Sequence, residues 1–594
     1  MPTKKWTGYE TLGVVSLLSV ILLFALRKPL LSGVCLLAAC VLAVIYTVKA
    51  FRGTLKPRQL LPGLLLTAGV SLFDLLCGYS LRGFGKGLPA LLLAAVLALW
   101  LWKRDMLRWK DAVKRCMGGL TAAAMLAATV FFMMNVNVRV APRVRSLQEG
   151  HDAYLEMLRR DAQANKKNVL LIMMDDMGYG DLSLLAETSI ALPNLEALGN
   201  NGIVMEQFYS SNPACSPSRF GCLTGRYAFR GHVDCVLYPT VSSGDIGSDL
   251  MSLFMNSVLF PRGVQGILGD EITVAEALQA AGYATGAFGK WHLGDYGEYL
   301  PNAQGFDYFY GSHYSNDMRP YAYYRNGEID RPAGFDQKEI NRILTGEVID
   351  FIDRNKDVPF FVYYASPWPH DPVSAGDAFL GTSKAGLYGD CLEEFDAGLG
   401  EILAKLETEG LLEDTLILFT SDNGPWFDGS TGGLRGRKNN NFNGGHQVPF
   451  VAAHPSLPRG SRINVPAMNI DLFPTILAFC GIDALPGDRA IDGVNLLPLL
   501  TGEIEAMDRE LFFVSGTGNI TAIQQNEYKY FESIPSENIA YPTTMLNKRL
   551  YRLDMDRNES YNVYDLYPEQ AAQMTERLAG YILEVQENPR GGAM

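Results

Sequence analysis

Apolar residues dominate the first quarter of the chain in five long runs. They cover residues 11–26, 29–48, 60–81, 87–102 and 116–138. Most of these runs approach the roughly 20 apolar residues that an α-helix needs to cross a bilayer. The pattern therefore predicts a transmembrane region of five helices over residues 1–140.

Basic residues in the segments between these runs predict how the helices are oriented. Twelve Lys and Arg residues lie before the first run and in the second and fourth connections, whereas the other two connections hold four. An excess of Lys and Arg marks the cytoplasmic side of a membrane. We therefore expect an integral, multi-pass membrane protein with a cytoplasmic N-terminus, membrane lipid as a partner, and the rest of the chain in the extracellular space or the periplasm.

From residue 168 onwards, short apolar runs alternate with amphipathic stretches. The runs at 168–174, 284–288, 359–365 and 415–420 are continuous, as is typical of parallel strands buried on both faces. Residues such as 273–281 and 392–407 are predicted to form helices between them. The order indicates an α/β fold, with a largely parallel central sheet flanked by helices, over residues 168–505. Residues 141–167 are interpreted as a partly helical juxtamembrane linker.

Charge divides the chain at nearly the same point. Residues 1–167 hold 23 Lys and Arg against 8 Asp and Glu, and the remainder holds 28 against 56, a net charge of −28. Because nucleic-acid binding requires clustered positive charge, we expect no nucleic-acid partner.

Polar side chains follow four of the predicted strands, at the point where each strand ends. In strand order they are Asp175 and Asp176, then Lys290 and His292, then His370, then Asp422 and Asn423. Ligands of open α/β sheets bind outside the carboxyl ends of the strands. A turn or a helix cap would explain any one of these segments alone, but the four together favour a single site.

The side chains of this site predict its chemistry. Four of them, Asp175, Asp176, Asp422 and Asn423, offer only hard oxygen donors, which suit calcium or magnesium. The basic residues Arg219, Lys290 and Lys438 would add positive charge. Such a site suits an anionic, tetrahedral group.

Cys215 stands before a predicted short helix. Ser216 is a suitable N-cap, Pro217 a suitable first helical residue, and Gly225 a suitable end. Cys215 would therefore lie at a helix N-terminus, where backbone N–H groups favour negative charge. The alternative is a buried cysteine that packs as a small hydrophobe. Five cysteines lie outside the apolar runs, and an odd number in an exported domain would leave one thiol unpaired.

The stretch CSPSRFGCLTGR, which begins at Cys215, resembles the signature of the type I, formylglycine-dependent sulfatase family of the alkaline phosphatase superfamily. GKWHLG at 289–294, SDNG at 421–424 and LRGRKNNNFNGGHQVP at 434–449 are similar to further segments of that family, in the same order. The resemblance implies the sulfatase fold over residues 168–505. It also implies a small C-terminal subdomain over residues 506–594, with a short antiparallel sheet and a closing helix.

The resemblance implies hydrolysis of sulfate monoesters to an alcohol and inorganic sulfate. A separate maturation enzyme would oxidise Cys215 to formylglycine, whose hydrate is the nucleophile. Calcium, with magnesium possible, would be held by Asp175, Asp176, Asp422, Asn423 and the modified Cys215. The substrate would be a sulfated small molecule, glycan or lipid.

The resemblance also implies roles for the remaining site residues. Arg219 would steady the aldehyde hydrate. Lys290, Lys438 and His370 would bind the sulfate and assist the leaving alcohol. His292 would take the proton that collapses the sulfated intermediate, since loss of a proton from one hydroxyl of the hydrate expels sulfate from the other.

Two alternative functions remain open on the sequence. One is a phosphodiester or phosphonate hydrolase, or a phosphoryl-group transferase, of the same superfamily. Cys215 and Asn423 argue against it, because the related transferases use a Thr nucleophile and the phosphonate hydrolases usually carry His in place of Asn423. The other is a non-catalytic, membrane-anchored binding module, which the complete set of metal and basic positions disfavours.

Two segments depart from the family pattern or lack motifs. Many members have Trp-Glu-Gly-Gly-x-Arg-Val-Pro where this chain has Phe442 to Pro449. His446 in that segment would either face the substrate or lie at the surface. We favour a structural role for this residue over a role in substrate contact. Residues 241–268 are interpreted as an active-site loop or an insertion.

The tyrosines at 308–324 are interpreted mainly as packing residues that form strands, not as a sugar-binding surface.

Overall fold

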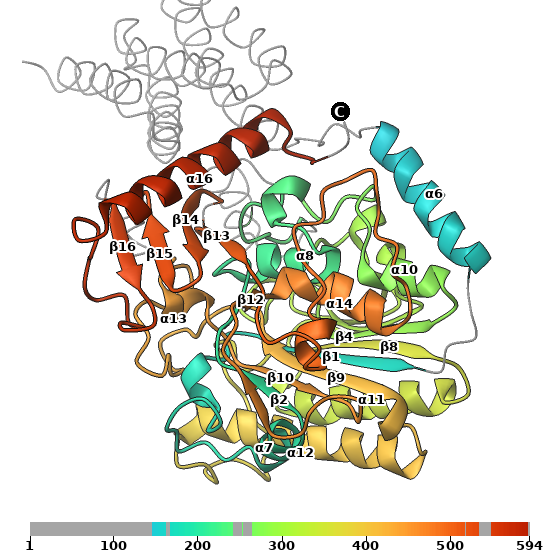
Figure 1. Cartoon of the computed structure of the whole chain (residues 1–594). Helices are drawn as coiled ribbons and strands as arrows, with labels where there is room; N and C mark the ends of the chain where they lie inside the picture. The colour runs from blue at the N-terminus through green and yellow to red at the C-terminus, as the bar shows by residue number, and fades with distance from the viewer. Residues whose placement is uncertain are drawn as a thin grey trace, which may run out of the picture. The chain divides into compact units, whose positions relative to one another are not determined.

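The central strand β1 (Asn168–Met174) sends alternate side chains to opposite faces of a large sheet (Figure 1). Val169, Leu171 and Met173 join one buried apolar cluster, and the residues between them join another. The computed structural model describes residues 145–161, 167–240, 252, 264–516, 518–533 and 548–591. The continuous apolar run that predicted β1 is thus explained by burial on both faces.

The main sheet has ten strands in the order β11-β2-β10-β9-β1-β8-β4-β5-β6-β7. The neighbours β9, β1, β8, β4 and β5 are mutually parallel, and antiparallel pairs occur beyond β9 and beyond β5. Their bounds are β2 Ile203–Met205, β4 Ala284–Lys290, β5 Tyr308–Ser312, β6 Tyr323–Arg325, β7 Glu328–Arg331, β8 Phe360–Ala365, β9 Thr415–Ser421, β10 Phe450–Ala453 and β11 Ser461–Ile463. Five parallel strands in the middle therefore direct their carboxyl ends to one edge.

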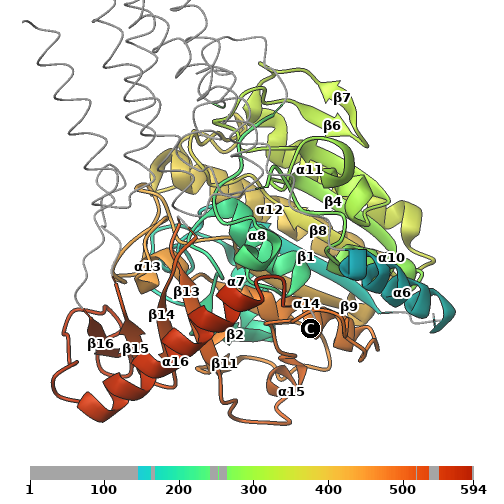
Figure 2. The ribbon, with the colours of Figure 1, turned by 90° about the horizontal axis from the view of Figure 1, so that it is seen from above.

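Helices cover both faces of this sheet (Figures 1 and 2). One face carries α6 (Arg145–Asp161), α8 (Cys215–Thr224), α10 (Val274–Ala280) and α14 (Leu472–Phe479). The other carries α7 (Pro193–Asn201), α11 (Ile340–Asn355) and α12 (Gly386–Thr408). The short helices α13 (Asn443–His446) and α15 (Leu497–Leu500) lie in the long connections, where β3 (Phe208–Tyr209) also pairs with β12 (Ala467–Met468). The result is the α/β sandwich that the sequence predicted.

A second, antiparallel sheet forms near the C-terminus. Its four strands follow one another in chain order: β13 Glu510–Val514, β14 Ile520–Gln525, β15 Tyr528–Phe531 and β16 Arg549–Arg552. Helix α16 (Pro568–Glu587) packs against this sheet through a third apolar cluster that includes Met574 and Leu578. This confirms the antiparallel sheet and closing helix. The boundary between residues 505 and 506 stays a prediction.

The predicted membrane localisation is contradicted by the structure. In the part of the chain that the structure describes, no helix is both long enough and apolar enough to cross a bilayer. The apolar runs between residues 11 and 138, which gave rise to that prediction, lie outside the described residues. An integral, multi-pass membrane protein is therefore not supported, and we do not retain this localisation.

Helix α8 ends at Gly225, as the sequence predicted. Gly225 has φ +69°, and its carbonyl accepts hydrogen bonds from the backbone N–H groups of Asp492 and Gly493 at 2.9 Å. A Cβ at this position would lie 2.9 Å from the Cβ of Phe473 in α14. The left-handed conformation and the close contact both require glycine here.

Gly225→Ala is expected to lower the free energy of unfolding by about 2–4 kcal/mol, from backbone strain and overpacking together. Gly410→Ala is the matched control, because Gly410 has φ +68° but a Cβ added there would meet nothing within 4 Å. The control is expected to cost only about 1 kcal/mol. Urea unfolding of both variants measures the difference, and equal losses would show that the contact with Phe473 contributes nothing.

Candidate active site

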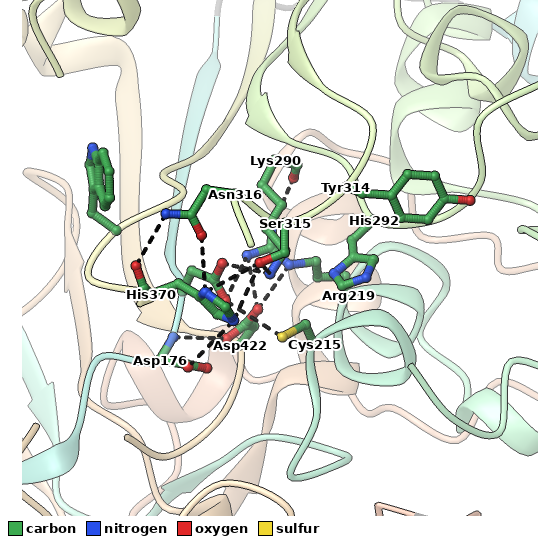
Figure 3. A network of polar contacts seen from close by, with 12 residues as sticks. Asp176, Cys215, Arg219, Lys290, His292, Tyr314, Ser315, Asn316, His370 and Asp422 are labelled. Atoms are coloured by element: carbon green, nitrogen blue, oxygen red, sulfur yellow. Dashed lines mark hydrogen bonds and ion pairs between the residues drawn. The ribbon is translucent and has the colours of Figure 1, made fainter. Parts of the chain in front are cut away.

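The carboxyl ends of β1, β4, β8 and β9 bring the predicted site residues together (Figure 3). Helix α8 adds Cys215 and Arg219, and the loop between β9 and α13 adds Lys438. Every predicted side chain is buried: Asp175, Asp176, Cys215, Arg219, Lys290, His292, His370, Asp422 and Asn423 are at most 9% exposed, and the side chain of Lys438 is 9% exposed. The strand-end rule therefore correctly predicted that these side chains lie close together, whereas their catalytic and metal-binding roles stay a prediction.

Three ion pairs form the centre of the site. Lys290 Nζ lies 2.6 Å from Asp175 Oδ2, Arg219 Nη2 lies 2.8 Å from Asp422 Oδ2, and Lys438 Nζ lies 2.7 Å from Asp176 Oδ1. Arg219 also donates to the backbone oxygen of Lys290 at 2.6 Å. Each buried charge thus has an opposite charge within contact, as a water-poor site requires.

The carboxyl groups of Asp175 and Asp422, at the centre of the site, have pKa values that are shifted in opposite directions. Burial opposes ionisation of Asp175, but Lys290, His370 and Arg219 hold its pKa well below the usual range. Burial and the neighbouring Asp175 raise the pKa of Asp422 to about 6. Carboxylates packed this closely repel one another, and a divalent cation among them would relieve that repulsion.

The donor set fits a hard divalent ion. Asp175, Asp176, Cys215 and His370 each offer an atom within 4.8 Å of the others. The Oδ1 of Asn423 is buried and has no hydrogen-bond partner among the described residues, so it is available as a ligand. Asp422 and Asn423 belong to the set predicted from the sequence, whereas His370 joins this cluster by geometry. Carboxylate and amide oxygens suit calcium or magnesium.

Cys215 is the first residue of α8, and its Sγ lies 3.5 Å from Asp175 Oδ1. The N-cap is Ala214, so the predicted cap at Ser216 is wrong; the Ser216 hydroxyl instead accepts a hydrogen bond from the backbone N–H of Leu237 at 3.0 Å. Burial raises the pKa of the Cys215 thiol to about 12. A thiol that stays neutral is a poor nucleophile.

The odd number of cysteines outside the apolar runs does not explain a thiol at position 215. All five described cysteines are buried, and none of them forms a disulfide bond among the described residues: Cys215, Cys222, Cys235, Cys391 and Cys480. Cys215 is distinguished from the other four by its place beside Asp175 at the centre of the ion-pair cluster.

The two site histidines are oriented by backbone carbonyl groups. His292 Nε2 lies 3.0 Å from the Leu237 oxygen, and His370 Nδ1 lies 2.7 Å from the Asp371 oxygen. Because a carbonyl oxygen only accepts, these two nitrogens carry the protons. Burial and the nearby Lys290 hold the pKa of His292 well below its usual range. His292 Nδ1 is then an unprotonated, buried nitrogen with no partner among the described residues.

Two further residues of the site, Ser315 and Asn316, were not predicted from the sequence. Ser315 Oγ lies 3.3 Å from both Lys290 Nζ and the His370 ring, and Asn316 Oδ1 lies 3.1 Å from His370 Nδ1 (Figure 3). They follow β5, a further parallel strand. A strand is predicted at the aromatic run 308–312, and applying the same strand-end rule to its carboxyl end would have found Ser315 and Asn316.

His446 is fully buried and has a structural role. Its Nδ1 lies 2.8 Å from the Ser210 oxygen, and its ring meets Phe513 edge-on at 5.0 Å. This confirms the structural role favoured from the sequence and excludes the surface position. Of the segment 241–268, only residues 252 and 264–268 are described, so its predicted role stays open.

Comparisons with known proteins agree with this arrangement. A family model described as Sulfatase matches residues 167–482. Human N-acetylgalactosamine-6-sulfatase is 38% identical over 375 residues, which cover 59% of this chain and 68% of that protein. Human arylsulfatase A is 32% identical and covers 68% and 84%. A Bacteroides thetaiotaomicron structure from a glycosaminoglycan-metabolism locus has a TM-score of 0.61, is 26% identical, and covers 70% of this chain and 99% of its own.

The burial of His446 predicts a pH-dependent loss of stability. Burial and the nearby Lys529 lower the pKa of His446 to about 3. The unfolded chain binds the proton near pH 6.5, so this contribution is complete above that pH and is lost as the pH falls towards 3. Between pH 7 and pH 5 the wild-type protein should lose about 2 kcal/mol more of its unfolding free energy than His446→Gln.

Urea unfolding of both proteins at the two pH values checks this difference. Other titrating groups affect the two proteins alike and cancel in the comparison. The same pH dependence in both would mean that His446 becomes protonated in the folded protein.

Proposed function

The chain belongs to the sulfatase family and hydrolyses sulfate esters, and we propose that formylglycine made from Cys215 supplies the nucleophile. The single observation that carries this proposal is the position of Cys215, at the start of α8 and beside Asp175 within the ion-pair cluster. Its neutral thiol is unsuited to attack, whereas an aldehyde hydrate offers a hydroxyl group. A maturation enzyme would carry out the conversion.

We infer that the resident metal is calcium, held by Asp175, Asp176, Asp422, Asn423 and the modified Cys215. When bound, such an ion polarises a hydroxyl and stabilises negative charge on sulfate oxygens. The Oδ1 of Asn423, which has no hydrogen-bond partner among the described residues, and the raised pKa of Asp422 support this ligand set. His370 Nε2 lies 3.8 Å from Asp176 Oδ2, at the edge of the same cluster.

The basic residues would bind the sulfate group and hold the nucleophile. Lys290 and Lys438 hold positive charges next to the carboxylates, because their ammonium groups pair with Asp175 and Asp176. Arg219 is anchored by Asp422 and by the Lys290 backbone, so its guanidinium has a fixed orientation beside Cys215. Preorganised cations of this kind stabilise charge that develops in the transition state.

The two histidines would handle protons. The free Nδ1 lone pair of His292 can accept the proton whose loss releases sulfate, since Nε2 is committed to the Leu237 oxygen. His370 keeps Nδ1 on the Asp371 oxygen and directs Nε2 towards Asp176, where it can assist the leaving alcohol. Ser315 and Asn316 hold this ring in place.

We propose that the substrates are sulfated glycans. The relative that is 38% identical is named for sulfated N-acetylgalactosamine, and a structure with a TM-score of 0.61 comes from glycosaminoglycan metabolism. Residues 168–505 would form the catalytic domain and residues 506–594 its C-terminal subdomain. Faster turnover of a phosphodiester than of a sulfate ester by the purified protein would favour the phosphohydrolase alternative.

Cys215→Ala is expected to reduce sulfate-ester turnover more than a thousandfold, because the nucleophile is lost. Cys222→Ala is the matched control, since Cys222 is a buried cysteine of the same helix outside the ion-pair cluster. It should keep activity and lose only stability. Circular dichroism should show that both variants are folded.

Mass spectrometry of the peptide that contains Cys215 checks the modification itself. In active wild-type protein, the mass should correspond to replacement of the thiol and one hydrogen by a carbonyl oxygen. Full activity with unmodified cysteine in every molecule would contradict the proposed nucleophile.

A further inference from the structure

Two aromatic residues, Trp426 and Phe427, lie a few residues after the proposed metal ligands Asp422 and Asn423, separated from them by Gly424 and Pro425. They lie on the loop that leaves the carboxyl end of β9 and continues to Lys438. Phe427 is 69% exposed, and Trp426 is partly buried. The rings of the two residues meet edge-on, with centroids 4.8 Å apart. An exposed apolar surface therefore lies on the same loop as two groups of site residues.

The backbone of this loop is held firmly. Arg437 Nη1 donates to the carbonyl oxygens of Trp426 and Gly429 at 2.6 and 2.8 Å. The backbone N–H of Ser430 donates to the buried carboxylate of Asp181 at 2.8 Å. The exposure of Phe427 is thus built into an ordered loop and does not come from a loose chain end.

The loop is also close to the reacting groups. The backbone N–H of Lys438 donates to the Pro425 oxygen at 3.1 Å, while Lys438 Nζ contacts Asp176. Phe427 follows Asn423 by four residues, so their Cα atoms are at most about 15 Å apart. The loop therefore keeps Phe427 in the neighbourhood of the ion-pair cluster, from which the alcohol part of a bound sulfate ester would extend.

Most of the tyrosines at 308–324 do not offer such a surface, and Tyr324 is partly buried. Tyr310, Tyr314, Tyr321 and Tyr323 are at most 4% exposed, which supports their interpretation as packing residues. On the described loops after β4 and β9, Phe427 is the most exposed large aromatic residue at 69%, and Tyr296 follows at 43%. The Arg437 guanidinium lies 5.8 Å from the centroid of this ring and supports it from within the loop.

We propose that Phe427 and Trp426 form an aromatic platform that stacks on a pyranose ring of the substrate. The C–H groups on the face of a pyranose ring are apolar and carry slight positive charge, which matches the negative face of an aromatic ring. The platform would bind the alcohol part of the ester while the ion-pair cluster binds the sulfate. This inference rests on the proposed glycan-sulfatase function and identifies the residues that select a sugar.

Phe427→Ala tests the platform with steady-state kinetics on the whole protein. With sulfated N-acetylgalactosamine as substrate, KM should rise about threefold to tenfold with little change in kcat. With an acyclic alkyl sulfate, KM should stay the same. The inhibition constant of inorganic sulfate should also stay the same, because sulfate alone does not reach the platform.

Two further variants separate stacking from general damage. Phe427→Tyr keeps the ring and should restore the wild-type KM for the sugar. Val358→Ala removes an exposed apolar side chain (47% exposed) just before β8, at the opposite edge of the sheet, and should change neither constant. An unchanged sugar KM in Phe427→Ala would overturn the platform while leaving the sulfatase assignment intact.

The failure of the underlying function has a different signature. If the wild-type protein hydrolyses alkyl or aryl sulfates but no sulfated sugar, both the glycan assignment and the platform are wrong. If KM rises equally for the sugar and the acyclic ester, Phe427 acts on the ion-pair cluster and the stacking proposal is overturned.

Discussion

The structure depends on a set of buried charges at the carboxyl ends of the central strands. Three carboxylates (Asp175, Asp176, Asp422) each contact one of three cations (Lys290, Lys438, Arg219). Removing one member of a buried pair leaves an unpaired charge, which costs about 3–5 kcal/mol. Because three negative charges face three positive charges, the set is neutral as a whole. A divalent cation would give it a net positive charge. The cluster can then hold a sulfate ester, which an uncompensated group of acids would repel.

The main sheet makes this cluster possible. Five parallel neighbours place their carboxyl ends along one edge, so residues more than 200 positions apart come into contact there, such as Asp176 and Lys438. Helix α8 supplies Cys215 and Arg219, and Gly225 fixes where that helix ends against α14. Most of the site side chains therefore come from strand ends and a helix, while the loop after β9 brings Lys438 to the same edge.

Much of the fold and the site could be predicted because strand burial and strand ends leave local signals. The run at Asn168–Met174 matches β1 residue for residue, and the acids after it are the ones in the site. Tertiary contacts leave no such local signal. The Ser216 hydroxyl accepts a hydrogen bond from the backbone N–H of Leu237 and does not cap its own helix. The contact of Ser315 with Lys290 depends on the pairing of β5 with β4. Hydropathy and loop charge predicted a membrane localisation that the described structure contradicts. Cysteine parity was uninformative, because none of the five described cysteines forms a disulfide bond among the described residues.

We propose that a divalent ion converts this neutral cluster into a sulfate-binding site. Isothermal calorimetry of the wild-type protein with inorganic sulfate tests it most directly, since sulfate is the product and does not turn over. We expect protein saturated with calcium to bind sulfate at least about tenfold more tightly than protein stripped with a chelator, because the added charge lies next to the ligand. Equal affinity in the two states would contradict the account.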